Sequence, residues 1–266
     1  MTIHPTAIID RGAELDSTVS VGPYAVIECG VKIGPDTEIG PHTVIGGPTE
    51  IGTGNRIGPF ANIGAPPQDL RYNNEPTLLQ IGDHNLIREY VTIHRGTPDG
   101  RGSTVLGSNN MLMANAHVAH DCTIGNHVIM ANAASLAGHV LVEDRANLGG
   151  FVAVHQFNRI GCYAYIGGMS GLTKDVPPYT IVAGTRNQMR IAGINRIGLK
   201  RNGFTPEQIR DIYGAYKIIF LDHDLLLQDA LVKAETAFPH CDLVRHLVEF
   251  FRTSERGVVR MVGEDE

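Results

Sequence analysis

Histidines and amides are concentrated in three segments in the middle of the chain. They read NAHVAHD at 115–121, AGH at 137–139 and VHQ at 154–156. An imidazole titrates near neutral pH, so such a cluster suits a general base that takes the proton of a hydroxyl group. A glycine N–H beside it could hold the oxyanion of an acyl-transfer intermediate. No serine or cysteine stands with these histidines in a nucleophile motif, which favours direct transfer of an acyl group to a bound acceptor.

The elements that must position these groups follow from an aliphatic residue at every sixth position. This hexad repeat runs from Ile3 to Ile63, from Ile81 to Ile93 and from Leu106 to Leu172. A period of six fits neither an amphipathic helix nor an alternating strand, and it is typical of a parallel β-helix. Three hexads close one triangular coil of 18 residues, so the sequence predicts a mainly-β column of roughly nine coils spaced about 4.8 Å apart.

The 18-residue coil predicts which polar groups meet. His120, Gly138 and Gln156 are 18 residues apart and therefore form one vertical line, with His117 and His139 at neighbouring hexad positions. A histidine above a glycine leaves room for a substrate against an unhindered backbone N–H. Three other histidines of the repeat are predicted to be ordinary surface residues: His42, His84 and His127.

Two gaps in the hexad repeat predict loops that leave the column. Residues 66–80 carry charged and aromatic side chains, including Asp69 and Arg71, and we expect this loop to supply binding groups. Residues 96–105 are rich in glycine and are interpreted as a tolerated surface insertion. The pattern stops shortly before Pro177-Pro178, which predicts a β-helix over residues 1–184 and an α-helical domain over residues 185–266.

The C-terminal part begins with a basic stretch and continues as helices. Residues 184–204 contain five cations and no acidic residue: Arg186, Arg190, Arg196, Lys200 and Arg201. The run Thr205-Pro206-Glu207-Gln208 supplies an N-cap, a first-turn proline and a capping-box glutamine. It predicts a helix to about residue 221, and amphipathic stretches near 224–238 and 241–254 predict two more.

Composition excludes several classes of function. The chain has 266 residues and a formal net charge of −6, which argues against general nucleic-acid binding. No charged-then-apolar leader and no 18-residue apolar run is present, so we expect no membrane span and a cytoplasmic protein. The four cysteines lack metal-type or paired spacing and are interpreted as reduced thiols.

Six longer motifs carry a resemblance to a known family: QDLRYNNEPT at 68–77, IREYVTIHRGT at 87–97, NAHVAHDCTIGN at 115–126, LAGHV at 136–140, VHQF at 154–157 and GLKRNGF at 198–204. On these the chain resembles the acyl-carrier-protein–UDP-N-acetylglucosamine O-acyltransferases, which open lipid A synthesis. The resemblance implies a left-handed β-helix and a homotrimer with active sites between adjacent columns. It also implies transfer of a 3-hydroxyacyl chain from acyl carrier protein to the 3-hydroxyl of UDP-N-acetylglucosamine, with no cofactor beyond the donor's phosphopantetheine.

The same resemblance implies roles for individual residues. His120 is the general base, Asp121 assists it, and Gly138 supplies the oxyanion N–H. Gly168 falls at the acyl-chain ruler and implies a long chain. Seven positions hold the nucleotide sugar or the pantetheine arm: Asp69, Arg71, His117, His139, Gln156, Asn195 and Arg201. Arg71 stands where many members have lysine, which keeps the charge but changes the donor geometry.

Two alternatives stay open at this point. Some relatives acylate a 3-amino sugar nucleotide and form an amide. A zinc enzyme of the same architecture, similar to the γ-class carbonic anhydrases, could use His117, His120 and His139 as ligands, although no metal site is predicted.

Overall fold

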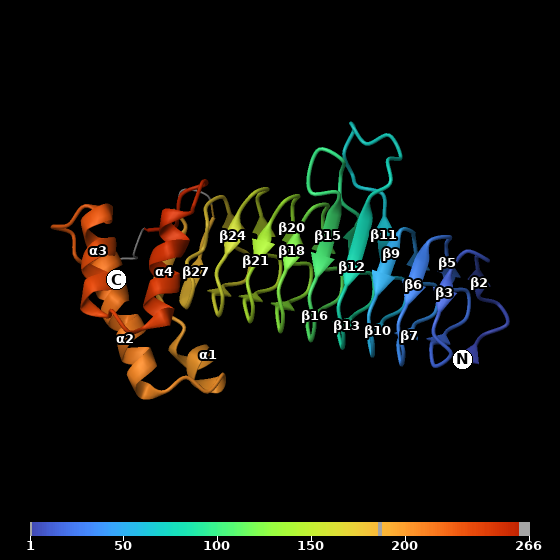
Figure 1. The fold of residues 1–266 in the computed structure, drawn as a ribbon, viewed down its shortest axis with the longest axis horizontal. Helices are drawn as coiled ribbons and strands as arrows, with labels where there is room; N and C mark the ends of the chain where they lie inside the picture. The colour runs from blue at the N-terminus through green and yellow to red at the C-terminus, as the bar shows by residue number, and fades with distance from the viewer. Residues whose placement is uncertain (1, 186–187, 261–266) are drawn as a thin grey trace.

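The chain folds into a long column with a helical unit at its C-terminal end (Figure 1). The computed structural model describes residues 2–185 and 188–260. Residues 2–172 form 26 short strands that wind around three flat faces, and the strands of each face pair in parallel. Two loops leave the middle of the column on one side, and the N-terminus lies at the end opposite the helices (Figure 1).

Each face is a sheet whose neighbouring strands lie one coil apart. Face A consists of β1 (Thr2–Ile3), β4 (Ser20–Val21), β7 (Glu38–Ile39), β10 (Arg56–Ile57), β13 (Leu86–Ile87), β16 (Met111–Leu112), β19 (Ile129–Met130), β22 (Asn147–Leu148), β25 (Tyr165–Ile166), β27 (Thr180–Ala183) and β28 (Arg190–Ile194). Face B consists of β2 (Ile8–Ile9), β5 (Val26–Ile27), β8 (Val44–Ile45), β11 (Asn62–Ala65), β14 (Thr92–His94), β17 (His117–Val118), β20 (Ser135–Leu136), β23 (Ala153–Val154) and β26 (Gly171–Leu172). Face C consists of β3 (Glu14–Leu15), β6 (Val31–Ile33), β9 (Thr49–Ile51), β12 (Leu78–Ile81), β15 (Ser103–Leu106), β18 (Thr123–Ile124), β21 (Leu141–Val142) and β24 (Arg159–Ile160).

Up to β26 the register between coils is 18 residues wherever neither loop intervenes, and it shortens to 16 between β25 and β27. On face B, for example, His117 pairs with Ser135 and Ser135 with Ala153. Across the first loop the paired residues are 30 apart (Thr49 and Leu79), and across the second they are 25 apart (Thr92 and His117). The loops therefore hold twelve and seven extra residues, all of them outside the stacked coils.

The aliphatic side chains of the hexad repeat fill the interior of the column. Ile63, Ile93, Val118 and Leu136 follow one another on face B, and none of them is exposed to solvent. Burial of such side chains contributes about 1.5–3 kcal/mol each, which is the main force that holds successive coils together. The predicted core is confirmed.

Glycine follows many of the aliphatic repeat residues, because neighbouring coils approach closely at these positions. A Cβ at Gly40 would lie 2.8 Å from the backbone carbonyl carbon of Gly58 on the next coil, so close approach between coils excludes a side chain. From Tyr24 onward, most corners have a left-handed residue two positions later, and it is usually not glycine, as at His42 (φ 56°) and Asp121 (φ 60°). These glycines therefore serve the close stacking of coils, and the bend itself is made by other residues.

The C-terminal unit contains α1 (Arg196–Arg201), α2 (Pro206–Tyr216), the π-helical turn η2 (Lys217–Leu221), α3 (Leu227–Ala237) and α4 (Asp242–Arg252). The predicted capping box of Thr205 and Gln208 at the start of α2 is confirmed. The short helix α1, within the basic stretch, was not predicted. β28 lies beyond residue 184 and still pairs with β27, so the sheet of face A extends into the segment that precedes the helices.

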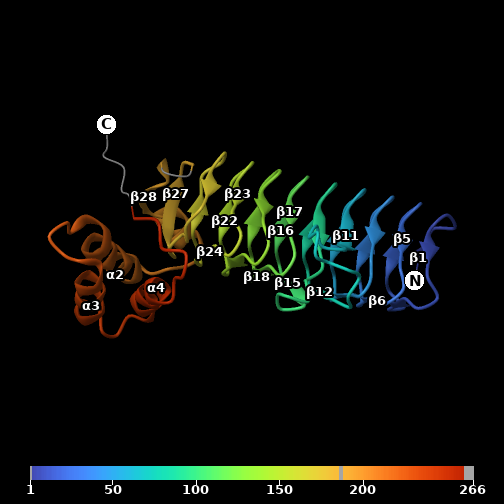
Figure 2. The ribbon, with the colours of Figure 1, turned by 90° about the horizontal axis from the view of Figure 1, so that it is seen from above.

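Helix α4 lies against the last coils of the column (Figure 2). Arg159 of β24 lies over the ring of Phe250 at 4.3 Å, and the Ser254 hydroxyl donates to the buried carboxyl of Asp175 at 2.7 Å. In the described part of the chain, no helix has the length and apolar character needed to cross a membrane.

Candidate active site

Both loops leave the column at the corner between faces B and C, in the two coils that precede the predicted catalytic histidine. The first follows β11 and the second follows β14. Arg95 anchors them, because its guanidinium donates to the carbonyls of Gly47 and Gly64 and to the Tyr72 hydroxyl. The fold thus gathers two irregular segments beside one corner of an otherwise regular column.

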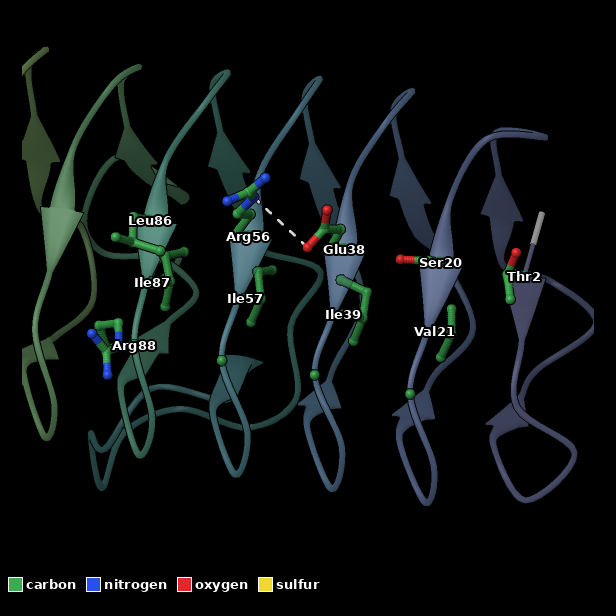
Figure 3. A pocket seen from close by; sticks show the side chains of 13 residues that line it. Thr2, Ser20, Val21, Glu38, Ile39, Arg56, Ile57, Leu86, Ile87 and Arg88 are labelled. Atoms are coloured by element: carbon green, nitrogen blue, oxygen red, sulfur yellow. Dashed lines mark ion pairs between the residues drawn. The ribbon is translucent and has the colours of Figure 1, made fainter.

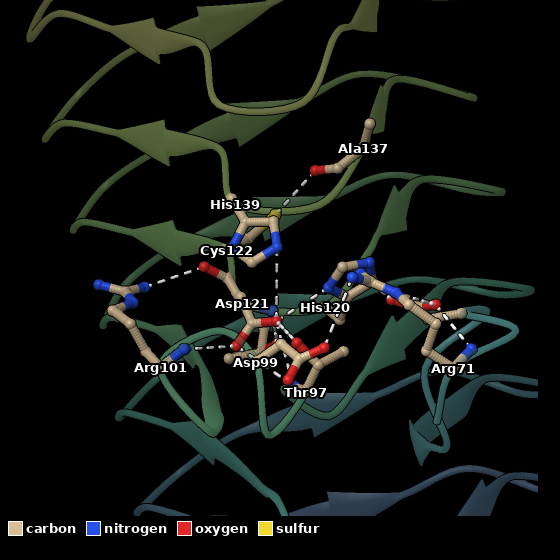
Figure 4. A network of polar contacts seen from close by, with 11 residues as sticks. Arg71, Thr97, Asp99, Arg101, His120, Asp121, Cys122, Ala137 and His139 are labelled. Atoms are coloured by element: carbon tan, nitrogen blue, oxygen red, sulfur yellow. Dashed lines mark hydrogen bonds and ion pairs between the residues drawn. The ribbon is translucent and has the colours of Figure 1, made fainter. Parts of the chain in front are cut away.

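His120 and Asp121 form a hydrogen-bonded pair at this corner (Figure 4). His120 Nδ1 lies 2.8 Å from Asp121 Oδ2, and the carboxylate is fully buried. Burial raises the pKa of Asp121, but hydrogen bonds from Thr97 and His120 outweigh it and lower that pKa overall. An ionised Asp121 accepts a hydrogen bond from Nδ1–H of His120, which leaves Nε2 as the basic nitrogen.

The second loop positions Asp121, which contradicts its interpretation as a tolerated surface insertion. The Thr97 hydroxyl donates to Oδ2 at 2.6 Å, and the N–H groups of Thr97 and Arg101 donate to the same carboxylate. Gly100 lies so close that a Cβ there would be 2.4 Å from the carboxyl carbon. Composition misled the prediction, because glycines that look like a flexible insertion instead let the backbone approach a buried charge.

Gly138 lies directly above His120, as the 18-residue rule predicts. A Cβ at Gly138 would lie 2.5 Å from Cε1 and 2.8 Å from Nε2 of the His120 ring. Among the described residues, no group accepts a hydrogen bond from the Gly138 N–H. The same corner position of other coils is occupied by Pro23, Pro41 and Pro59, which have no N–H group. The hydrogen bonds between coils therefore need no donor at this position. A free N–H beside an imidazole is thus a product of the repeat itself.

Two further histidines lie around this pair. His139 Nε2 is 3.9 Å from Asp121 Oδ2, and its ring stacks on Phe157 at 4.5 Å. His117 Nδ1 lies 2.7 Å from the Thr92 hydroxyl. Burial lowers the pKa of both imidazoles, which favours their neutral forms and a hydrogen-bonding rather than a charged role.

His94 was not predicted as a site residue. It is buried beneath His117 with ring centroids 5.0 Å apart, and its Nδ1 has no partner in the described part of the chain. Burial, with smaller contributions from His117 and His120, lowers its pKa to about 4. The 25-residue register across the second loop hid this neighbour, because His94 and His117 do not obey the 18-residue spacing.

Asp69 and Arg71 of the first loop form an ion pair near the histidines. Arg71 Nη2 lies 2.8 Å from Asp69 Oδ2, and Arg71 Nη1 lies 3.5 Å from Asp99 of the second loop. The hydrogen bond from Arg71 lowers the pKa of Asp69 to about 2, and the nearby His120 adds to this effect. The exposed guanidinium therefore keeps its position while remaining available to an anionic ligand (Figure 4).

Asn195 and Arg201 lie elsewhere, in a groove of about 840 Å³ between face A and α1. His127 and Tyr165 also line it, so His127, although exposed, is part of a concave surface rather than an isolated surface residue. The Asn195 side chain accepts the N–H of Gly198 and donates to the Tyr163 carbonyl. This amide caps α1 and thereby fixes one wall of the groove.

The remaining predicted residues lie at two different corners of the column. Gln156 is exposed at the B–C corner one coil beyond Gly138. Gly168 is exposed at the corner between faces A and B, followed by Met169, which is 74% exposed. The structure therefore gathers His117, His120, Asp121, Gly138 and His139 in one place. It leaves Gly168 and the Asn195–Arg201 groove on other parts of the column.

A second groove, of about 410 Å³, lies at the N-terminal end of face A (Figure 3). Arg56 and Glu38 face each other there at 3.7 Å, and Arg88 lies nearby. It contains none of the predicted catalytic residues.

Two groups of side chains place possible metal ligands within 4.8 Å of one another in the described part of the chain. One is His120, Asp121 and His139, but there the Asp121 oxygens already accept hydrogen bonds from Thr97 and Arg101. The other is Glu143, Cys162 and His246 at the helical end. The first group is better satisfied as a hydrogen-bonded acid–base site than as a metal centre.

The class of protein follows from the repeat. The family model described as bacterial transferase hexapeptide (six repeats) matches residues 12–47, 30–65 and 103–138. A solved structure of UDP-N-acetylglucosamine acyltransferase from Francisella novicida has a TM-score of 0.94 and 38% identity, covering 97% of this chain and 94% of that one. The predicted fold, a left-handed parallel β-helix followed by a small α-helical unit, is confirmed.

The particular family follows from the C-terminal unit and from close relatives. A model described as UDP N-acetylglucosamine O-acyltransferase, domain 2, matches residues 175–259. A relative from Halorhodospira halophila named acyl-[acyl-carrier-protein]–UDP-N-acetylglucosamine O-acyltransferase is 52% identical over 97% of this chain and 99% of its own length. One of the same name from Alkalilimnicola ehrlichii is 51% identical over 97% and 99%. The chain belongs to the UDP-N-acetylglucosamine O-acyltransferase family, and the zinc-enzyme alternative is not favoured.

Proposed function

We propose that this protein transfers a 3-hydroxyacyl chain from acyl carrier protein to the 3-hydroxyl of UDP-N-acetylglucosamine, the first step of lipid A biosynthesis. The observation that carries the proposal is the juxtaposition of His120, Asp121 and the free N–H of Gly138. These groups supply a base, its orienting carboxylate and an oxyanion donor, which suffice for direct acyl transfer. The acyl donor arrives on phosphopantetheine, and no other cofactor is needed.

The mechanism uses Nε2 of His120 as the base. The imidazole takes the proton of the sugar hydroxyl while the hydroxyl oxygen attacks the thioester carbonyl carbon. The carbonyl oxygen becomes an oxyanion that accepts the N–H of Gly138. The intermediate then collapses, the carbon–sulfur bond breaks, and the protonated His120 returns its proton to the departing thiolate. Asp121 stabilises the imidazolium that exists between these two proton transfers.

Mass spectrometry of the product tests this function. The purified protein, UDP-N-acetylglucosamine and a panel of 3-hydroxyacyl thioesters of acyl carrier protein should give one UDP-sugar ester with a preferred long chain. An acceptor with a 3-amino group in place of the hydroxyl should react more slowly. Preferential formation of the amide would identify the amino-sugar alternative, and no acylated product with either acceptor would contradict the proposal.

We further propose that the active form is a homotrimer. The His120 group lies at the edge of face B, whereas Asn195 and Arg201 line a groove on face A. A head-to-tail contact of face A on face B of the next copy brings both sets into one cleft, and such contacts close into rings. The corner between faces A and B then points toward the ring axis.

That corner carries an exposed stack of aromatic rings. Tyr24, His42, Phe60 and Tyr90 stack at centroid distances of 5.0, 4.8 and 5.2 Å, and Tyr24, Phe60 and Tyr90 are each about half exposed. Rings of this kind are depleted from free surfaces and enriched at interfaces. Their position favours burial against the corresponding corners of two further copies.

Changing Phe60 and Tyr90 to asparagine should weaken the trimer. Both residues have positive φ (57° and 60°), which asparagine tolerates, so the coil should keep its shape while it loses the stacked rings. Sedimentation should show three chains for the wild-type protein. The double variant should dissociate at protein concentrations at which the wild-type trimer is still intact. A wild-type protein that sediments as an active monomer would contradict the arrangement.

The basic stretch is the proposed docking site for acyl carrier protein. Arg190, Arg196, Lys200 and Arg201 are exposed, and none of them has an ion-pair partner among the described residues; Arg186 lies outside the described residues. An uncompensated basic surface on a chain with net charge −6 favours an acidic partner. The proposed setting is the cytoplasm, where the four free cysteines stay reduced.

Reversing two of these charges should weaken donor binding. The change Arg190→Glu with Lys200→Glu should raise KM for the acyl carrier protein thioester and flatten its dependence on salt, because the steering charges are lost. The matched control Arg11→Glu with Lys32→Glu makes the same charge change at the far end of the column. Equal KM values for both double variants at every ionic strength would remove this assignment.

A further inference from the structure

A second cluster of chemically competent side chains lies outside the proposed active site, where the column meets α4. Glu143 and Cys162 follow β21 and β24 at the corner between faces C and A, on consecutive coils, and His246 comes from α4. His246 Nε2 lies 3.1 Å from Glu143 Oε2, and Cys162 Sγ lies 3.7 Å from His246 Nδ1. Three segments that are distant in sequence thus converge on one point.

The three side chains are of the types that zinc prefers. Each offers one ligand atom, and these atoms all lie within 4.8 Å of one another. Zinc bonds of about 2.0–2.3 Å at tetrahedral angles separate ligand atoms by roughly 3.3–3.8 Å, so the thiol, which now lies beside Nδ1 of His246, must turn toward Nε2 when the ion binds. A carboxylate and a thiolate together neutralise a divalent cation, which reduces the cost of holding it in a partly buried place.

The surroundings already contain the outer contacts that orient metal ligands. The hydroxyl of the buried Tyr179 lies 3.1 Å from His246 Nδ1, and its oxygen can accept a hydrogen bond from Nδ1–H when Nε2 binds a metal. The Cys162 N–H donates to Glu143 Oε2 at 2.8 Å and holds the carboxylate beside the thiol. Glu143 and His246 remain 19% and 38% exposed in their side chains, which leaves a path for an ion.

We propose that Glu143, Cys162 and His246 bind one zinc-type divalent cation, with water in the fourth position, and that this ion fastens α4 to the column. Binding requires loss of the thiol proton, so one proton is released for each ion bound. Arg159, 3.9 Å from Glu143, is the nearest competing cation. The ion takes no part in acyl transfer, because the cluster lies at another corner of the column.

Titration of the intact protein with Co²⁺ and Zn²⁺ tests the site. Co²⁺ should produce the near-ultraviolet absorption band of a bound thiolate at one ion per chain, and Zn²⁺ should abolish the band by displacement. Zn²⁺ should also raise the melting temperature, and a chelator should reverse that rise. Acyltransferase activity should not change with zinc.

Cys162→Ser and His246→Gln should each abolish the band and the zinc-dependent rise in melting temperature. Cys241→Ser, which removes a cysteine of the same helical unit outside the cluster, should leave both intact. If either site variant fails to fold, the stoichiometry and the band of the wild-type protein still decide the question. A wild-type protein that shows no thiolate band, or a band that survives Cys162→Ser, would overturn the proposal and leave Glu143, His246 and Tyr179 as a hydrogen-bonded contact without metal.

Discussion

Replacing His120 with alanine should lower kcat by at least about 100-fold while KM for both substrates changes little. The acceptor hydroxyl is a poor nucleophile at neutral pH and must lose its proton as it attacks the thioester. Nε2 of His120 is the nitrogen left unprotonated by the bond between Nδ1 and Asp121, so its removal takes away the base. The fold should persist, because the ring lies outside the aliphatic core.

The control must be a histidine that takes no part in a concave surface. His127 borders the face A groove and is therefore unsuitable, whereas His4 is exposed at the N-terminal end of the column. His4→Ala should keep wild-type turnover, and circular dichroism should show the same fold for both variants. Wild-type turnover by His120→Ala would exclude the proposed mechanism.

Gly138→Ala should lower kcat by a similar factor, on the order of 100-fold, for a different reason. Its methyl group would lie 2.5 Å from Cε1 of His120, so either the ring turns away from Asp121 or the coil shifts. Both responses misplace the base relative to the oxyanion donor, and small displacements of catalytic groups are costly. Single-turnover measurement at saturating donor and acceptor would give the loss directly.

Gly150 provides the matched control for this change. It occupies the same coil position two corners further along the chain, two residues after the end of β22, and a Cβ there would meet only Asn132 O at 3.4 Å. Gly150→Ala should show what an added methyl group costs the fold at this position. If Gly138→Ala has the melting temperature of Gly150→Ala and the kcat of the wild-type protein, the close packing of Gly138 on His120 has no catalytic role.

The regular part of the molecule could be predicted from the sequence because its physics is periodic. One aliphatic residue in six determines three faces, and the 18-residue coil places Gly138 above His120 without further information. The helix start at Thr205 was equally predictable, because a capping box is a local signal. The hand of the coil came from the resemblance to known enzymes, since periodicity is the same for both hands.

The irregular part could not be predicted in the same way. Thr97 reaches Asp121 across 24 residues, through a loop whose seven extra residues break the register. Nothing in a glycine-rich segment indicates that it will close over a buried carboxylate. His94 was not predicted as a site residue for the same reason. Asn195 was predicted as a ligand-binding residue, although its amide also caps a helix.

The 18-residue register makes the column behave like a screw with three marked positions per turn. Removing one full coil between two corners would move everything beyond it by about 4.8 Å along the axis and leave each side chain on its own face. Removing a single hexad would turn the rest of the molecule by one face and carry Gly138 away from His120. Lengthening or shortening such a protein is therefore tolerable only in whole turns, or at a corner such as those after β11 and β14, where extra chain can leave the column and the phase of the strands that follow is unchanged.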